Sequence, residues 1–238
     1  MPDTITLTGR VRPAPMFRPE LRAAIRSGLK TQTRRTVKKA KEYHLEPAKR
    51  PQFWGPQDED DIWAFIDMAY PTDTYPYPVR SPHGKPGDMW YLGEPLRPSE
   101  SGITLYADDG ETVWLEGAET ITWPWKCRIL SSRYMPRRAA RTFMVVTDVR
   151  RERVQDISEE DAIAEGVNIS LADRNIVALY AECRPDLPCP AASQWAFHAL
   201  WDSINGKRPG CAWADNSWVF AYTFRLATPA EAEKGTER

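Results

Sequence analysis

The sequence GLKTQTRR at residues 28–35 is the stretch around which we expect the fold to be organised. It follows residues 19–27, where the spacing of Leu21, Ala24 and Ile25 predicts one apolar face of a short helix. Gly28 stands where a helix-ending glycine is expected, because glycine adopts the left-handed backbone conformation without strain. The residues after Gly28 are therefore expected to leave the helix as an extended segment. A solvated basic strand and a segment that faces an anion or a nucleobase both agree with this composition.

Charge is strongly segregated along the 238 residues, although the net charge is only −1. Residues 1–50 carry 13 basic and 4 acidic residues, and residues 51–121 carry 3 and 14. Residues 122–155 carry 9 basic and 2 acidic residues, and residues 156–238 carry 7 and 13. Two basic blocks far apart in the sequence can form one positive surface for a phosphate-bearing partner, or they can pair with the acidic segments.

The composition is that of a globular protein, with 42% hydrophobic and 27% charged residues. We expect no membrane association, because no apolar run approaches the length of about 18 residues that a spanning helix needs. The first 15 residues show no apolar core of a secretory signal, so we expect the protein in the cytoplasm of the cell that makes it. No metal and no cofactor are expected, because the four cysteines (Cys127, Cys183, Cys189 and Cys211) form no C-x-x-C pair.

Strand patterns outnumber helix patterns in the rest of the chain. The predicted strands are residues 13–17, 89–92, 103–106, 112–115, 141–150 and 217–226. The predicted helices after the first one are residues 158–165, which Ser158 begins as N-cap, and residues 194–204. Residues 37–62 and 71–87 are rich in proline or lack periodicity, so we expect irregular loops there.

These elements predict an α+β fold, most simply a small mixed β-barrel with covering helices and loop insertions. We expect a single domain over residues 13–227. Its insertions are expected at about residues 38–80, 95–125 and 167–190, and residues 1–12 and 228–238 are expected to be flexible tails.

The spacing G-x-K-x-x-T, carried by Gly28, Lys30 and Thr33 and followed by Arg34 and Arg35, resembles the signature of ASCH domains. These domains are relatives of the PUA RNA-binding fold. Further segments resemble the phage- and prophage-encoded branch of the family: PHGKPGDMW at 82–90, MPRRAAR at 135–141, VQDISEEDAIAEGV at 154–167 and LWDSIN at 200–205. The resemblance covers roughly residues 14–227. At Ser81 that branch usually has a cysteine.

The resemblance implies a nucleotide-related ligand. In the characterised bacterial ASCH amidohydrolase, which cleaves N4-acetylcytidine, the catalytic residues match Lys30, Thr33 and Glu165 here. In that arrangement Thr33 attacks an acyl carbon, Lys30 is the base, and Glu165 protonates the leaving amine. Partial burial or the neighbouring arginines would lower the pKa of Lys30 towards this role.

Three classes of function stay open at this point. The chain is a binder of RNA or of a modified nucleoside, a hydrolase that acts on N4-acylated cytidine, RNA or another nucleoside, or a phage accessory protein. The accessory protein would engage a host protein through the acidic residues 56–73. The binding residues that we expect for RNA or a nucleoside are Gly28, Thr31, Arg34, Arg35, Trp90, Arg137, Arg138 and Arg141, since arginine forks suit phosphates and aromatic faces stack on bases.

Overall fold

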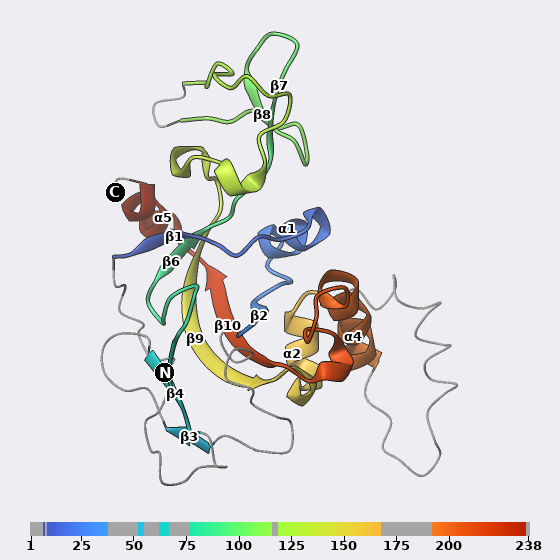
Figure 1. Ribbon diagram of the computed structural model, residues 1–238. Helices are drawn as coiled ribbons and strands as arrows, with labels where there is room; N and C mark the ends of the chain where they lie inside the picture. Colours follow the sequence, from blue (N-terminus) through green and yellow to red (C-terminus); the bar gives the residue numbers. More distant parts are fainter. Residues whose placement is uncertain are drawn as a thin grey trace. The chain divides into compact units, whose positions relative to one another are not determined.

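A computed structural model describes residues 7, 9–37, 52–54, 62–66, 77–115, 119–167 and 192–236 (Figure 1). Within these residues the fold is a mixed α+β structure in which strands dominate, so the predicted fold class is confirmed. Most of the acidic insertion 56–73 lies outside the described residues, as do Cys183, Cys189 and nearly all of the insertion 167–190.

The largest sheet of the described residues has five strands in the order β1-β6-β9-β10-β2. The strands are β1 (Val11–Pro13), β6 (Met89–Tyr91), β9 (Phe143–Arg153), β10 (Trp218–Leu226) and β2 (Gln32–Thr36). Strand β1 is parallel to β6, whereas β6 is antiparallel to β9 and β10 is antiparallel to β2. The predicted barrel is wrong, because the outer strands β1 and β2 do not pair and the described sheet is therefore open.

Two smaller sheets complete the described strands. Strands β3 (Gln52–Trp54), β4 (Ile62–Ile66) and β5 (Tyr77–Arg80) form an antiparallel sheet in a region where we expected loops. Strand β8 (Thr104–Tyr106) pairs with β7 (Leu96–Pro98). Residues 112–115, which we predicted as a strand, contribute only isolated bridges such as Leu105 with Thr112.

The chain divides into two compact units, which we describe separately. Unit 1 comprises Met1–Leu29, Pro86–Thr147 and Phe224–Arg238, and unit 2 comprises Lys30–Lys85 and Asp148–Thr223. Strands β9 and β10 contribute residues to both units. The extent of a single domain over residues 13–227 stays a prediction.

Unit 1 contains helix α1 (Pro19–Arg26), which coincides closely with the predicted helix. Gly28 follows it with a φ of 76°, and two hydrogen bonds end the helix, from Gly28 N to Ile25 O and from Leu29 N to Ala24 O, both 2.9 Å. This is a Schellman motif, in which a left-handed residue satisfies carbonyls that have no partner inside the helix. The role that we assigned to Gly28 in ending the helix is confirmed.

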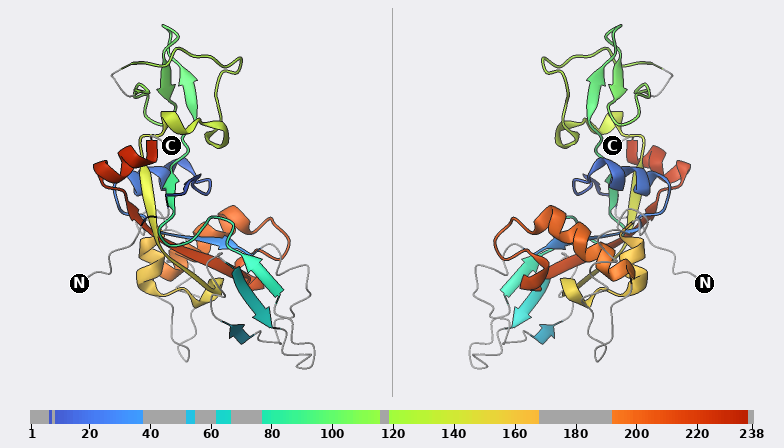
Figure 2. Two further views of the ribbon diagram at one scale, coloured as in Figure 1. Left: turned by 90° about the vertical axis from the view of Figure 1, so that its left-hand side faces the viewer. Right: turned by 90° about the vertical axis from the view of Figure 1, so that its right-hand side faces the viewer.

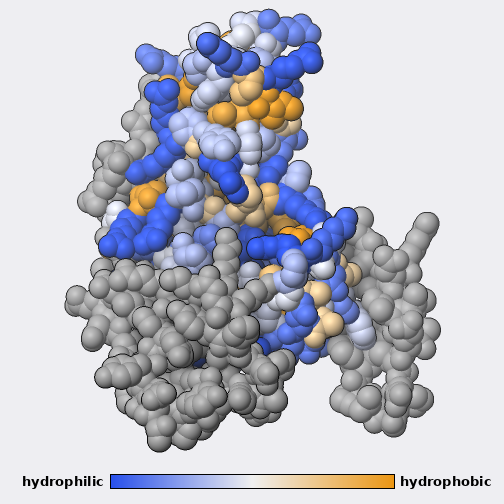
Figure 3. All heavy atoms as spheres, in the orientation of Figure 1, coloured by the Kyte–Doolittle hydropathy of each residue, from blue (hydrophilic) through white to orange (hydrophobic). Residues whose placement is uncertain are grey.

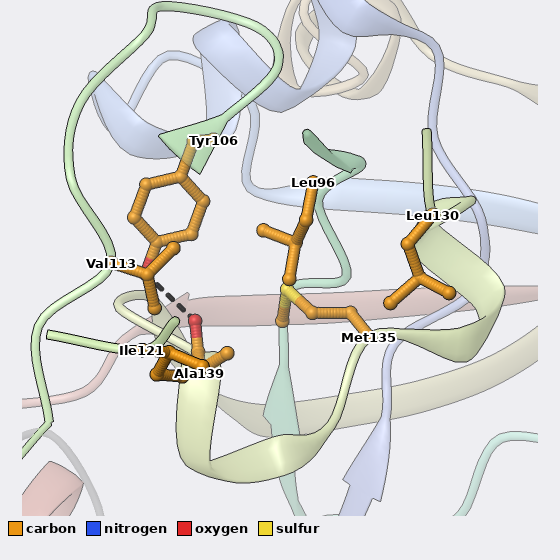
Figure 4. Packing of buried hydrophobic residues seen from close by; sticks show 7 residues of the cluster. All are labelled: Leu96, Tyr106, Val113, Ile121, Leu130, Met135 and Ala139. Carbon is orange, nitrogen blue, oxygen red and sulfur yellow. Dashed lines mark hydrogen bonds between the residues drawn. The ribbon is translucent and has the colours of Figure 1, made fainter. Parts of the chain in front are cut away.

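The second part of unit 1 is a loop-rich region around β7 and β8, where hydrophobic and hydrophilic side chains lie side by side on the surface (Figure 3). A hydrophobic cluster lies inside it (Figure 4). The hydroxyl of Tyr106 in this cluster donates to the carbonyl of Ala139 over 2.7 Å. The cluster consists of Leu96, Tyr106, Val113, Ile121, Leu130, Met135 and Ala139.

Unit 1 also contains helix α5 (Pro229–Thr236), where we predicted a flexible tail. Glu231 explains the helix, because its carboxylate accepts hydrogen bonds from the Thr228 backbone (2.8 Å) and from Arg225 (2.7 and 2.8 Å). The prediction of a flexible tail at residues 228–238 is therefore wrong for the part of the chain that forms α5.

Unit 2 contains helices α2 (Glu159–Ala164) and α4 (Ala192–Asn205), which pack against each other (Figure 1, Figure 2). Both helices were predicted, and the Ser158 hydroxyl accepts from Asp161 N over 3.1 Å as an N-cap should. Val219 of β10 packs with Ala162 of α2 and Phe197 of α4. The two helices therefore cover the face of β10 that carries Val219.

Among the described residues, no helix combines the length and the apolar character that crossing a membrane requires.

Replacing Gly28 by alanine tests the helix end. An added Cβ meets no atom within 4 Å, so any loss of stability in the variant arises from backbone strain alone. We expect Gly28→Ala to lower the free energy of unfolding by about 1 kcal/mol, measured by urea denaturation. Gly28→Asn should lose less, because asparagine tolerates the left-handed conformation. If both variants were as stable as the wild type, the left-handed backbone at position 28 would not strain a residue with a side chain.

Candidate functional site

The segment after Gly28 enters unit 2 at Lys30 and forms β2 from Gln32 onward. Thr31 N donates to the carbonyl of Ala164 over 2.8 Å, which ties the start of β2 to the last turn of α2. Glu165 follows directly as the C-cap residue of α2. This backbone contact brings the side chains of Lys30 and Glu165 together, although they are 135 residues apart in the chain.

Lys30 and Glu165 form a buried ion pair. Lys30 Nζ donates to Glu165 Oε2 over 2.6 Å and to the Glu165 carbonyl oxygen over 2.6 Å. Lys30 is 2% exposed and Glu165 is 4% exposed. A lysine and a glutamate are seldom this deeply buried unless they pair with each other.

The pKa of Lys30 lies below its ordinary value. Burial is the main cause, since it disfavours the charged form, and the positive charges of Arg35 and Arg34 act in the same direction. The charge and hydrogen bond of Glu165 oppose these effects without cancelling them. The amine of Lys30 therefore loses its proton more easily than that of a lysine in water.

Arg34 binds three carboxylates and is itself inaccessible to solvent, with a side-chain exposure of 0%. Its Nε donates to Glu152 over 2.6 Å, its Nη2 to Asp161 over 2.9 Å and its Nη1 to Glu165 over 3.1 Å. Its guanidinium also lies 5.7 Å from the centre of the Phe197 ring. The structure thus places Arg34 inside unit 2 as the partner of carboxylates, where we expected a ligand-binding arginine.

Gln32 and Arg150 extend this network. The Gln32 amide donates to Asp161 over 2.7 Å, and Arg150 donates to Glu152 over 2.9 Å and to Asp161. Burial alone would raise the pKa of Asp161, but the Gln32 hydrogen bond and the charges of Arg34 and Arg150 hold it below its usual range. Three cations (Lys30, Arg34 and Arg150) thus face three carboxylates (Glu152, Asp161 and Glu165), and their formal charges balance.

Thr33 and Arg35 lie on the other face of β2 from Gln32 and Arg34, because side chains alternate along a strand. Thr33 stands opposite Tyr222 and Arg35 stands opposite Phe220 in the register with β10. Thr33 is 3% exposed. The described side-chain hydrogen bonds of Glu165 come from Lys30 and Arg34, and none of them involves Thr33.

Arg35 has a pKa lowered to about 10. Burial is the main cause and the charge of Arg208 contributes, while Glu165 and Tyr222 oppose them. Arg35 is thus within electrostatic reach of Glu165 and of the Thr33–Tyr222 face. Among the expected binding residues, Arg35 is thus the one that interacts electrostatically with both Glu165 and the face of β2 that carries Thr33.

Ser81 and Tyr222 are polar groups of this second face that the sequence reasoning did not select. The hydroxyls of Ser81 and Tyr222 are 2.8 Å apart, and Ser81 Oγ lies 2.6 Å from the Gly84 carbonyl oxygen. His83 meets the Tyr222 ring edge to face, with centroids 5.7 Å apart. Ser81 is therefore next to the cross-strand partner of Thr33.

The remaining predicted site residues belong to unit 1. Gly28 ends α1, and Trp90 is 0% exposed with its ring 5.6 Å from that of Phe224, so it lies in the core. Arg138 is exposed. Buried Nε and Nη2 atoms of Arg137 have no hydrogen-bond partner among the described residues.

Arg141 is surrounded by carboxylates. It donates to Glu94 over 2.7 and 2.9 Å, to Glu111 over 2.6 Å and to Asp109, and its guanidinium lies 3.8 Å from the centre of the Tyr106 ring. Burial alone would lower the pKa of Arg141, but the hydrogen bonds and charges of Glu94 and Asp109 raise it above the ordinary value. Its donors hold unit 1 together, where we expected them to bind an external phosphate.

Glu94 is a second buried carboxylate that the sequence reasoning did not select as important for the structure. It is 0% exposed and accepts from Arg26 of α1 as well as from Arg141. Arg22 of α1 binds Asp108 through two hydrogen bonds of 2.6 and 2.7 Å. Carboxylates of the segment 94–111 therefore fix the loop-rich region to α1 within unit 1.

No group of three or more histidine, cysteine, aspartate or glutamate side chains suited to a metal ion occurs in the described parts of the chain. Of the two described cysteines, Cys127 is exposed and Cys211 is buried, and both are free thiols. Comparison of the chain with models of known families, with curated proteins and with solved structures finds no match.

Replacing Glu165 by glutamine tests the buried pair. Lys30 and Arg34 would each lose a carboxylate partner inside the protein, so we expect Glu165→Gln to lower the free energy of unfolding by about 3 kcal/mol, measured by chemical denaturation. Glu160→Gln is the matched control, because Glu160 lies exposed on the same helix. A loss no larger than that of the control would show that the Lys30–Glu165 pair contributes nothing to stability.

Proposed function

We propose that the chain is an ASCH-related protein of PUA-like ancestry that binds a modified nucleoside and hydrolyses an N4-acyl group on cytidine. The observation that carries this proposal is the buried contact of 2.6 Å between Lys30 and Glu165, in which burial lowers the pKa of the lysine. A lysine with a lowered pKa is a suitable base for a threonine nucleophile.

The proposed reaction uses the three residues in sequence. The Thr33 hydroxyl oxygen attacks the acyl carbon, and its proton passes to the neutral amine of Lys30. Protonated Glu165 donates a proton to the N4 atom as the bond from this atom to the acyl carbon breaks, which releases cytidine. Water then hydrolyses the acyl-Thr33 ester and releases the carboxylic acid.

The hydrogen bond between Lys30 and Glu165 supports the assignment of both proton-transfer roles to one pair. A single proton on this contact is held either by the amine or by the carboxylate, and the reaction needs the neutral amine with the protonated acid. Burial lowers the pKa of Lys30 and so favours the neutral amine that the reaction needs. Thr33 lies three residues from Lys30, on the strand face that also carries Arg35.

The polar groups on this face supply a reason for a nucleoside ligand. Arg35 provides a cation, and Tyr222 and Ser81 provide hydroxyls near Thr33. A nucleobase combines hydrogen-bonding edges with a planar face, which suits a small set of fixed polar and aromatic groups.

The proposal predicts that the protein releases acetate from N4-acetylcytidine and that the activity depends on three side chains. We expect Lys30→Ala, Thr33→Ala and Glu165→Gln each to lower kcat by about 100-fold or more, because each removes a group that acts on the reacting atoms. Glu160→Gln should keep the wild-type rate, and circular dichroism checks that each variant is folded. If a folded Thr33→Ala variant keeps its turnover, Thr33 is not the nucleophile. If the wild type turns over no member of a panel of N4-acylcytidines, the protein does not catalyse the proposed reaction.

The pH dependence of turnover gives an independent prediction. Lys30 acts only in its neutral form, so kcat/KM should rise with pH through the pKa of Lys30, at a pH below the 10.5 of an ordinary lysine. Arg35→Gln removes a positive charge that lowers this pKa, so the rise should move to higher pH in that variant. A rise that Arg35→Gln leaves at the same pH would show that another group titrates.

A further inference from the structure

Residues 126–138 of unit 1 form a surface segment that the Lys30 site does not use. It carries five basic residues and no acidic residue, and we call it the basic segment. The basic residues are Lys126, Arg128, Arg133, Arg137 and Arg138.

The hydrophobic cluster of unit 1 fixes the orientation of the basic segment. Leu130 and Met135 of the segment, and Ala139 just after it, point into the cluster (Figure 4). Between these anchors the chain forms two short 3-10 helices, Ser132–Tyr134 and Arg137–Ala139. Lys126 and Arg128 before these anchors, and Arg133 and Arg138 between them, are all exposed.

The charges of the basic segment are not compensated within the described structure. The nearby arginines outside the segment are paired: Arg22 with Asp108, Arg26 with Glu94, and Arg141 with Glu94, Asp109 and Glu111. These pairs occupy the carboxylates of the segment 94–111 apart from Glu100. None of the five cations of the basic segment forms an ion pair with a described carboxylate. The basic segment therefore presents a positive surface, whereas carboxylates neutralise the nearby arginines outside it.

Arg137 differs from the other four cations because it is only partly exposed. Its Nε and Nη2 atoms are buried and have no hydrogen-bond partner among the described residues. These two nitrogens are closed to an external phosphate, so Arg137 adds positive charge to the surface while the four exposed cations are available for contacts.

Aromatic and apolar side chains lie between the cations. Tyr134 is 68% exposed and Ile129 is 61% exposed, which is unusual for side chains of this size. A surface that alternates cations with an exposed ring provides both phosphate contacts and a stacking platform.

We infer that the basic segment binds a single-stranded nucleic acid, with the exposed cations Lys126, Arg128, Arg133 and Arg138 on phosphates and Tyr134 stacked on a base. An acidic protein would match the charges but would leave the exposed ring of Tyr134 without a planar partner. A duplex would match the charges but would not present an unstacked base. The inference goes beyond the proposed function, because it concerns a segment of unit 1 that contributes no residue to the Lys30 site of unit 2.

The inference is tested by measuring the affinity for an unstructured 12-nucleotide RNA by fluorescence anisotropy at several salt concentrations. Arg133→Ala/Arg138→Ala should lower the affinity on the order of tenfold at about 0.1 M salt. It should also reduce the slope of log K against log salt by about 1.4, at about 0.7 per lost phosphate contact. Arg97→Ala/Lys207→Ala is the matched control, because it removes two charges from exposed positions outside the segment. A loss equal to that of the control would overturn the inference.

Tyr134→Ala separates nucleic acid from other polyanions. It should lower the affinity for the RNA on the order of tenfold with an unchanged salt slope, because base stacking is not an ionic contact. Binding of an abasic oligonucleotide of the same length should not respond to this variant. Polyglutamate binding as tight as the RNA, or an equal effect of Tyr134→Ala on the abasic strand, would overturn the assignment to nucleic acid.

The Lys30→Ala variant keeps this test independent of the proposed reaction. It should bind the RNA as the wild type does, since Lys30 belongs to unit 2 and is not one of the residues of the basic segment. If the wild type binds the RNA but does not turn over N4-acylcytidine, only the proposed hydrolase activity is refuted. If the wild type turns over the free nucleoside but does not bind the RNA, only nucleic-acid binding by the basic segment is refuted.

Discussion

The cost of burying charge is the constraint on which both units depend. Arg34 has no solvent exposure and would be strongly destabilising without Glu152, Asp161 and Glu165 around it. Glu94 has no exposure either, and it is held by Arg26 and Arg141. In each case the partners lie far apart in the chain, so neutralising one side chain requires a strand or helix to dock in one particular place. β2 is thereby fixed to α2 in unit 2, and the loop-rich region is fixed to α1 in unit 1. Such networks give a fold a single arrangement even where they add little net stability.

This constraint also divides the arginines of the chain by role. The arginines with several carboxylate partners, Arg34 and Arg141, are occupied by the protein itself. Arg35, on the other face of β2, is buried enough for its pKa to fall, and the exposed arginines of the basic segment have no described carboxylate partner. Under the proposed functions, ligand contacts would therefore come from cations outside the Arg34 and Arg141 networks. The reactive candidate, Lys30, lies at the edge of one network, where burial and Glu165 act on it in opposite directions.

Regular elements with strong local signals were predictable, and contacts between distant segments were not. The helix end at Gly28, the N-cap at Ser158 and the long strands at 143–153 and 218–226 follow from backbone preference and periodicity, and the structure contains all of them. The helix at 229–236 was missed although TPAE at 228–231 carries its signal, a threonine N-cap with proline next and glutamate three residues on. The meeting of Lys30 with Glu165 was expected only from the family resemblance. Nothing local could separate Arg141 from Arg138, because the carboxylates that neutralise Arg141 lie 30 to 47 residues away.

The hydroxyl chain beside Thr33 has a direction. A carbonyl oxygen only accepts, so the single proton of Ser81 points to Gly84, and Tyr222 must give its own proton to Ser81. The three oxygens thus lie in one fixed proton order, which ties the loop around Ser81 and Gly84 to strand β10 within unit 2. Only a side chain with both a donor and an acceptor at position 81 can hold this order, because it must accept from Tyr222 and donate to Gly84 at once.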